Sequence, residues 1–156
     1  MKVRNILVPT DFSEHAEAAF TVAREFARTF GARIQLLHVY DIPDLASVYE
    51  LTFPAEVDAG IRKVASRKLE DWKKRAAAEG IETSTCLEFG RPSRAIVEHA
   101  RESKSDLIVI GTRGLGALKQ LLLGSVAERT IRTAPCTVLT VGSDATMEPP
   151  GLESSQ

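Results

Sequence analysis

The sequence has neither an excess of one charge nor a long apolar run, and both absences narrow the class of protein. Its 20 basic and 21 acidic residues give a formal net charge of -1, whereas a nucleic-acid-binding domain usually carries a basic face. No segment approaches the roughly 18 consecutive apolar residues of a membrane-spanning helix. The opening residues, MKVRNILVPTDFSEH, contain too short an apolar run for a secretory signal. We therefore expect a cytoplasmic protein that binds neither nucleic acid nor membrane.

Metal-binding and redox motifs are also missing. The two cysteines, Cys86 and Cys136, fall in strand-like segments without a C-x-x-C spacing, which predicts two buried, reduced thiols. His15, His38 and His99 show no spacing typical of a metal site or a catalytic triad. Each is expected to be a solvated or packed side chain, so the sequence predicts no metal site made by protein residues.

The 156 residues, 44% of them hydrophobic and 26% charged, fit one globular domain. Strand-like apolar runs occur at 3–9, 33–40, 81–90, 106–111 and 136–141, and helical patterns at 13–31, 56–79, 92–104 and 125–134. This alternation predicts an α/β fold: one doubly wound, five-stranded parallel sheet with helices on both faces, of the Rossmann-like type. We expect the domain to span residues 1–142. A long surface loop is predicted at 41–56 and a disordered tail at 143–156.

For two helices the sequence predicts which side chains face the core, and for the first it also predicts both ends. In 13–31, Ser13 is expected to cap the start and Gly31 to close the end in the left-handed conformation. The stripe predicted for that helix is Ala16, Phe20, Ala23, Ala27 and Phe30. The stripe predicted for the charged helix at 56–79 is Ile61, Val64, Leu69 and Trp72.

Two strands are expected at the edges of the sheet. Residues 81–90 alternate like a strand exposed on one face, and 136–141, CTVLTV, is the last strand and carries no charge. An open edge without charge or proline is a template for pairing. We therefore predict an isologous homodimer through strand 136–141, centred near Val138 and Leu139. The alternative is an edge covered by the predicted tail.

A glycine-rich loop, GTRGLGALKQLLLGS at 111–125, follows the buried strand 106–111. Ligands of doubly wound sheets bind beyond the carboxyl ends of the strands, which makes this loop and the PTD turn at 9–11 candidate sites. The loop has neither the dinucleotide glycine spacing nor the lysine of a P-loop. A phosphate cradle in this loop would therefore rely mainly on backbone N–H groups.

Those backbone groups suit an anion. Gly111 and Gly114 can form one wall of a phosphate cradle without side chains in the way. Gly124 and Ser125 open the next helix, whose first N–H groups lie at the positive end of its dipole; further donors there are Val126 and Ala127. The Ser125 hydroxyl can donate to a phosphate oxygen, although Ser125-x-x-Glu128 also reads as a capping box. The two roles are compatible.

Taken together, these segments resemble the universal stress protein family over residues 2–141. The pattern G-2x-G-9x-G-[ST], typical of the ATP-binding branch of that family, is matched by Gly111, Gly114, Gly124 and Ser125. The segments ILVPTDFSE, LLHVY and GSVAERTIRTAPCTVLTV add to the likeness. The resemblance implies an adenine nucleotide alpha hydrolase-like fold and ATP bound with Mg or Mn, the ion being held mainly by the phosphates. It also implies a homodimer through the last strand.

The resemblance further implies roles for single residues. Asp11 would accept hydrogen bonds from the ribose hydroxyls, though a helix cap or turn residue is the alternative. Pro9 and Thr10 would shape the adjoining wall. Backbone groups of Val39 would meet the adenine edge, although a core strand residue needs no ligand. Arg113 would pair with phosphate charge, and an ordinary exposed arginine is an equal alternative.

Three functions compete for such a pocket. The first is a stress-response or signalling module in which ATP modulates conformation, dimerisation or partner binding, and the second is a slow ATPase or nucleotidyl-transfer enzyme. The third, an interaction protein with an empty pocket, is disfavoured by the intact glycine pattern. The second is disfavoured because the sequence shows no evident base, arginine finger, HIGH-type signature or S-G-G-x-D-S signature. We predict the first, with no catalytic residue and at most weak hydrolysis.

Overall fold

The structure, a computed structural model, describes residues 2–41, 55–114 and 123–143. It contains one parallel sheet whose strands are β1 (Asn5–Pro9), β2 (Arg33–Tyr40), β3 (Thr83–Phe89), β4 (Leu107–Gly111) and β5 (Thr137–Val141). The strand order is β3-β2-β1-β4-β5. The predicted doubly wound sheet is therefore confirmed, and so is the placement of β3 and β5 at its edges.

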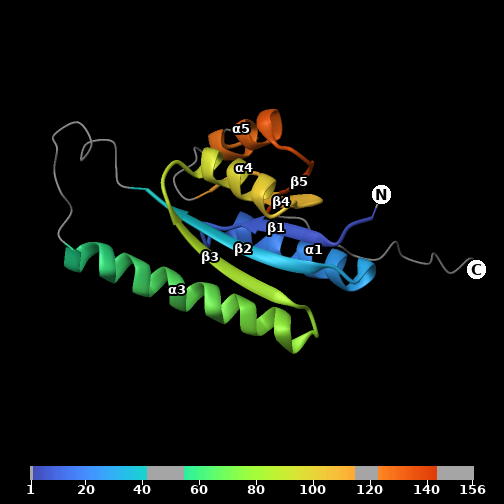
Figure 1. Cartoon of the computed structure of the whole chain (residues 1–156), viewed down its shortest axis with the longest axis horizontal. Coiled ribbons are helices and arrows are strands. Elements are labelled where there is room, and N and C mark those ends of the chain that lie inside the picture. Colours follow the sequence, from blue (N-terminus) through green and yellow to red (C-terminus); the bar gives the residue numbers. More distant parts are fainter. Residues whose placement is uncertain (1, 42–54, 115–122, 144–156) are drawn as a thin grey trace, which may run out of the picture.

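Helices cover both faces of this sheet. On one face lie α1 (Glu14–Phe30) and α3 (Ala55–Ala78), and on the other α4 (Pro92–Glu102) and α5 (Ser125–Thr133) (Figure 1). The central strands divide their side chains between two cores because successive residues of a strand point to opposite faces. In β1, Ile6 and Val8 belong to the core beneath α1 and α3, whereas Leu7 belongs to the core beneath α4 and α5.

An aspartate joins β1 to β4 where the two strands begin. The carboxylate of Asp106 accepts hydrogen bonds from the N–H groups of Arg4 at 2.8 Å and Asn5 at 2.9 Å, and these bonds lower the pKa of Asp106 below its ordinary value. The N–H of Asp106 donates in turn to the Asn5 carbonyl at 2.9 Å. The register then continues with Ile6 opposite Leu107.

Helix α1 has the predicted ends. Ser13 caps it by accepting from the N–H of Ala16 at 3.3 Å, and Gly31 ends it with φ of 63°. The predicted stripe is correct up to Ala27 and wrong at Phe30, which is 50% exposed. Phe30 is the last residue of the helix, where its ring lies beside that of Phe26 with centroids 5.8 Å apart.

Helix α3 is rotated away from the prediction. Leu69 and Trp72 are buried as expected, but Ile61 and Val64 are 38% and 57% exposed. The inward stripe consists of Ala65, Leu69, Trp72 and Ala76. The Trp72 ring stacks on Phe20 of α1, with centroids 4.7 Å apart, and this contact sets the rotation of the helix. The first turns of α3 extend past the ends of β2 and β3, so no strand lies beneath them (Figure 1).

Three predictions fall wholly or mainly outside the described residues: the loop at 41–56, the middle of the glycine loop and the tail at 143–156. They stay predictions. Among the helices that are described, none is long and apolar enough to cross a bilayer.

The corrected stripe of α3 predicts unequal effects for two truncations. Leu69→Ala should lower the free energy of unfolding by about 2–5 kcal/mol because it opens a cavity in the core. Val64→Ala should change it by less than about 0.5 kcal/mol because the side chain is exposed. Urea unfolding followed by circular dichroism measures both, and equal losses would contradict the observed rotation.

Candidate functional site

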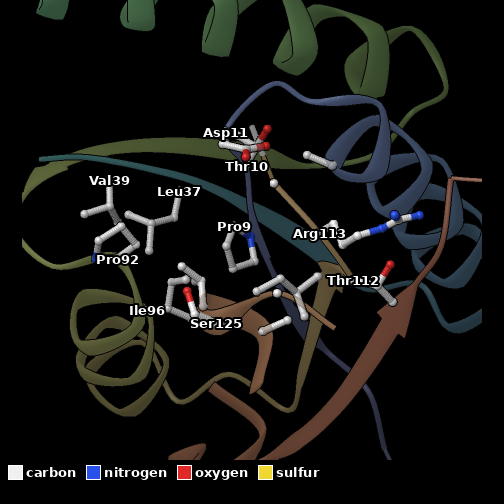
Figure 2. A pocket seen from close by; sticks show the side chains of 17 residues that line it. Pro9, Thr10, Asp11, Leu37, Val39, Pro92, Ile96, Thr112, Arg113 and Ser125 are labelled. Carbon is white, nitrogen blue, oxygen red and sulfur yellow. The ribbon is translucent and has the colours of Figure 1, made fainter. Parts of the chain in front are cut away.

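A cavity of about 490 Å³ opens at the carboxyl ends of the central strands. Its walls come from β1 and the turn into α1, from β2, α4 and β4, and from the start of α5 (Figure 2). The structure brings together at this cavity every residue predicted for the site: Pro9, Thr10, Asp11, Val39, Gly111, Arg113, Gly114, Gly124, Ser125, Val126 and Ala127. Their roles toward a ligand stay predictions.

One half of the cavity is apolar. Leu37 and Val39 lie two residues apart on β2 and so face the same way, and Ile96 of α4 and Ile110 of β4 complete this half. The sequence reasoning missed Leu37 and Ile96 as lining residues. The period of two from Val39 could have found Leu37, but the position of α4 over β2 depends on packing between distant segments. Such an apolar slot suits a planar ring.

The start of α5 forms another part of the lining, and here the predicted capping box is wrong. Gly124 is the N-cap residue, and no side chain makes a cap hydrogen bond. Ser125 occupies the first helical position and is exposed, while the Glu128 carboxylate pairs with Arg132 at 2.8 Å instead of turning back to the cap. The helix therefore turns its first N–H groups, at the positive end of its dipole, toward the cavity.

The turn after β1 is held by its own side chains. The Asp11 carboxylate Oδ1 accepts from the N–H of Ser13 at 3.0 Å, and Thr10 Oγ1 accepts from the N–H of Phe12 at 2.9 Å. Asp11 is thus a turn residue, as one of the two sequence alternatives had it, and it also lines the cavity. Its contact with a ribose stays a prediction. The ring of His38 donates from Nδ1 to the Thr10 carbonyl at 2.7 Å, since a carbonyl can only accept.

Phe12 has a backbone conformation that is unusual for its type, with φ of 63°. Its ring packs against two others: that of His38, with centroids 4.8 Å apart, and that of Trp72, at 5.6 Å and edge-on. The aromatic contacts hold the chain in this left-handed turn. As a result, the preceding residue, Asp11, lies on the side of the cavity opposite Ser125 (Figure 2).

Two glycines of the loop are required for different reasons. A Cβ at position 111 would lie 2.7 Å from the backbone carbon of His15, so the first turn of α1 packs directly on the end of β4. A Cβ at position 114 would instead overlap the Asp11 carboxylate oxygen Oδ2. Gly111 therefore serves the packing of α1, and Gly114 serves the position of a side chain that lines the cavity.

Thr112 and Arg113 lie between these glycines. The Thr112 hydroxyl is 3.1 Å from His15 Nδ1. The guanidinium of Arg113 extends away from the side of the cavity that holds Leu37 and Val39 (Figure 2). Its pairing with phosphate stays a prediction.

Comparison with known proteins identifies the family. The model of the universal stress protein family matches residues 2–142. The chain belongs to the universal stress protein family. A universal stress protein of Thermus aquaticus is 37% identical over 144 residues, which cover 88% of this chain and 98% of that relative.

Solved structures of this family share the fold. The structure of hypothetical protein MJ0577 has a TM-score of 0.83 at 34% identity, with 94% of this chain and 100% of that chain covered. A universal stress protein in complex with cAMP has a TM-score of 0.65 at 28% identity, with 92% and 99% covered. One structural relative was therefore seen with an adenine nucleotide.

The contact between Gly111 and α1 predicts a loss of stability at position 111. Gly111→Ala should lower the free energy of unfolding by about 1–3 kcal/mol because the added methyl group meets the backbone of His15. Gly60→Ala is the matched control: this methyl meets open space on α3 and should stabilise by up to about 1 kcal/mol. Denaturant unfolding compares them, and a Gly111→Ala protein as stable as the wild type would refute the assigned contact.

Proposed function

We propose that the protein is an ATP-binding stress-response or signalling module, in which the nucleotide modulates conformation, dimerisation or partner binding. The supporting observation is that one cavity joins an apolar slot, a carboxylate and a helix N-terminus. The apolar slot suits a base, the carboxylate suits the hydroxyl donors of a ribose, and the helix N-terminus suits a chain of phosphates. The structural relative in complex with cAMP supports the choice of adenine.

In this proposal the base lies against Leu37 and Val39, and the backbone of β2 offers polar groups to its edge. The ribose hydroxyls donate to Asp11. The phosphates lie at the N–H groups of Ser125 and Val126, with Gly114 leaving their approach open. A serine hydroxyl that is not engaged in a helix cap can donate to a phosphate oxygen.

A magnesium or manganese ion would accompany ATP. Among the described residues that line the cavity, Asp11 is the only acidic one. Mg²⁺ binds through one or two carboxylates, water and substrate phosphates rather than through a cage of protein ligands. Because Asp11 is assigned to the ribose, the ion would be held mainly by the phosphates and by water, and it would screen the charge of the phosphates.

We expect at most weak hydrolysis of ATP. Phosphoryl transfer needs a group that orients the attacking water and further positive charge at the transferred phosphoryl group. The described lining includes no histidine, glutamate or lysine, and its one carboxylate is assigned to the ribose. Its one basic residue, Arg113, could supply positive charge, but it cannot act as a base that orients the attacking water. Location in the cytoplasm stays a prediction.

A hydrogen bond links the cavity to the edge of the sheet. The N–H of Thr112, next to Arg113 in the glycine loop, donates to the carbonyl of Val141 at 2.9 Å. Val141 ends β5, the edge strand through which we propose the homodimer. A shift of residues 111–114 on binding of phosphates would therefore act on the strand that we propose for pairing, and so could couple the nucleotide to dimerisation.

Calorimetry tests the nucleotide assignment. The wild type should bind ATP in the presence of Mg²⁺, and Gly114→Ala should weaken binding at least about tenfold, or about 1.4 kcal/mol, because the methyl group displaces Asp11. Gly60→Ala, remote from the cavity, should bind as the wild type does. Equal affinity of all three proteins would show that the nucleotide does not use Asp11 and Gly114. Phosphate release at roughly 1 per second or faster would favour the enzyme alternative.

Light scattering tests the assembly. The wild type should be a dimer at tens of micromolar, and Val138→Pro should be a monomer because proline interrupts an edge strand. Thr85→Pro places the same change in the other edge strand, β3, and should stay dimeric. Circular dichroism checks that both variants fold. A wild type that remains monomeric would rule out the proposed interface.

A further inference from the structure

Three side chains with metal-binding atoms meet on the α4 face of the sheet, outside the cavity. Cys86 and Glu88 are two residues apart on β3 and share a face, and His99 comes from α4. Glu88 Oε1 lies 2.7 Å from His99 Nδ1 and 3.5 Å from Cys86 Sγ. All three donor atoms lie within 4.8 Å of one another. The sequence spacing gave no sign of this cluster because its members converge only in the fold.

The cluster is partly shielded and still reachable from solvent. The side chains of His99 and Glu88 are 16% and 33% exposed, and Cys86 is half-buried against the core beneath α4. Burial and the neighbouring Glu88 raise the pKa of the Cys86 thiol. Without a cation, the thiol and the imidazole both direct hydrogen atoms at the same oxygen of Glu88.

We propose that Cys86, Glu88 and His99 form a binding site for one divalent cation of the zinc class, with water as the fourth ligand. Sulfur and imidazole donors select zinc over Mg²⁺ or Mn²⁺, which prefer oxygen. The donor atoms of this site therefore differ from those of an ion bound to nucleotide phosphates, which are all oxygen. Binding would release the thiol proton to solvent, and His99 would coordinate through Nδ1 with its proton on Nε2.

The geometry needs only side-chain adjustment. In a tetrahedral site with Zn–S of about 2.3 Å and Zn–N or Zn–O of about 2.0–2.2 Å, neighbouring donor atoms are about 3.3–3.6 Å apart. The separation of Sγ and Oε1 already meets this value, at 3.5 Å. The Nδ1–Oε1 pair would open from 2.7 Å, and a half-exposed glutamate can make that movement by rotation.

The site would brace a wall of the cavity. In the sheet register Leu37 lies opposite Cys86 and Val39 opposite Glu88, and both of these β2 residues line the cavity. His99 follows the lining residue Ile96 by one turn of α4. A cation held between β3 and α4 would stabilise the folded state in proportion to its occupancy.

The proposal is tested by titration with cobalt. The full-length protein is first reduced and treated with a chelator, and no nucleotide is added. Co²⁺ should produce a thiolate-to-cobalt charge-transfer band, which Zn²⁺ should abolish by displacement. The band should persist in Cys136→Ser, the matched control, and disappear in Cys86→Ser. Glu88→Gln and His99→Gln should each weaken Zn²⁺ binding at least about tenfold, since even residues that only support metal ligands matter by that factor.

Saturating Zn²⁺ should also raise the melting temperature of the wild type and of Cys136→Ser but not that of Cys86→Ser. Circular dichroism checks the fold, and Glu88→Gln provides an independent variant if Cys86→Ser is unfolded. The proposal is overturned if the wild type gives no charge-transfer band. It is equally overturned if Cys86→Ser keeps the band, or if Cys136→Ser loses it.

Discussion

The pairing of β1 with β4 is the constraint on which the rest of the structure depends. Asp106 fixes the start of this pair through the backbone of Arg4 and Asn5, and from there the two strands run parallel to the same edge of the sheet. The chain leaves β1 toward β2 and leaves β4 toward β5, on opposite sides. The segments that follow β1 and β4 must therefore diverge, and the space between them is the cavity.

The sequence was sufficient to predict the sheet, because apolar runs and helical periods alternate clearly along the chain. It also predicted which two strands lie at the edges. It failed where the answer depends on contacts between distant segments. The rotation of α3 follows from the stacking of Trp72 on Phe20, and alanines face inward where larger apolar residues were expected. His99 likewise approaches β3 because of where α4 packs, and the local sequence pattern does not predict that position.

In the glycine loop, two positions must be glycine for different reasons, which the glycine motif alone does not distinguish. Gly111 is small because a helix backbone lies against it, whereas Gly114 is small because a carboxylate does. The first constraint concerns folding and the second concerns the cavity. The same distinction applies to Ser125, whose hydroxyl was expected to cap α5 and instead stands at the first helical position, with the preceding glycine as cap. A serine at this position offers its side chain to whatever occupies the cavity.

The left-handed turn at Phe12 has a consequence for the energetics of association. A bulky residue in this backbone region costs about 1–3 kcal/mol, and the rings of His38 and Trp72 hold it there. That cost falls on the folding equilibrium, because contacts within the chain itself hold the turn. In the proposed function, a nucleotide would meet a carboxylate whose orientation is already fixed, so its affinity would lose little to the ordering of this turn. The aromatic cluster, which lies outside the cavity, would thus preorganise the recognition that we propose inside it.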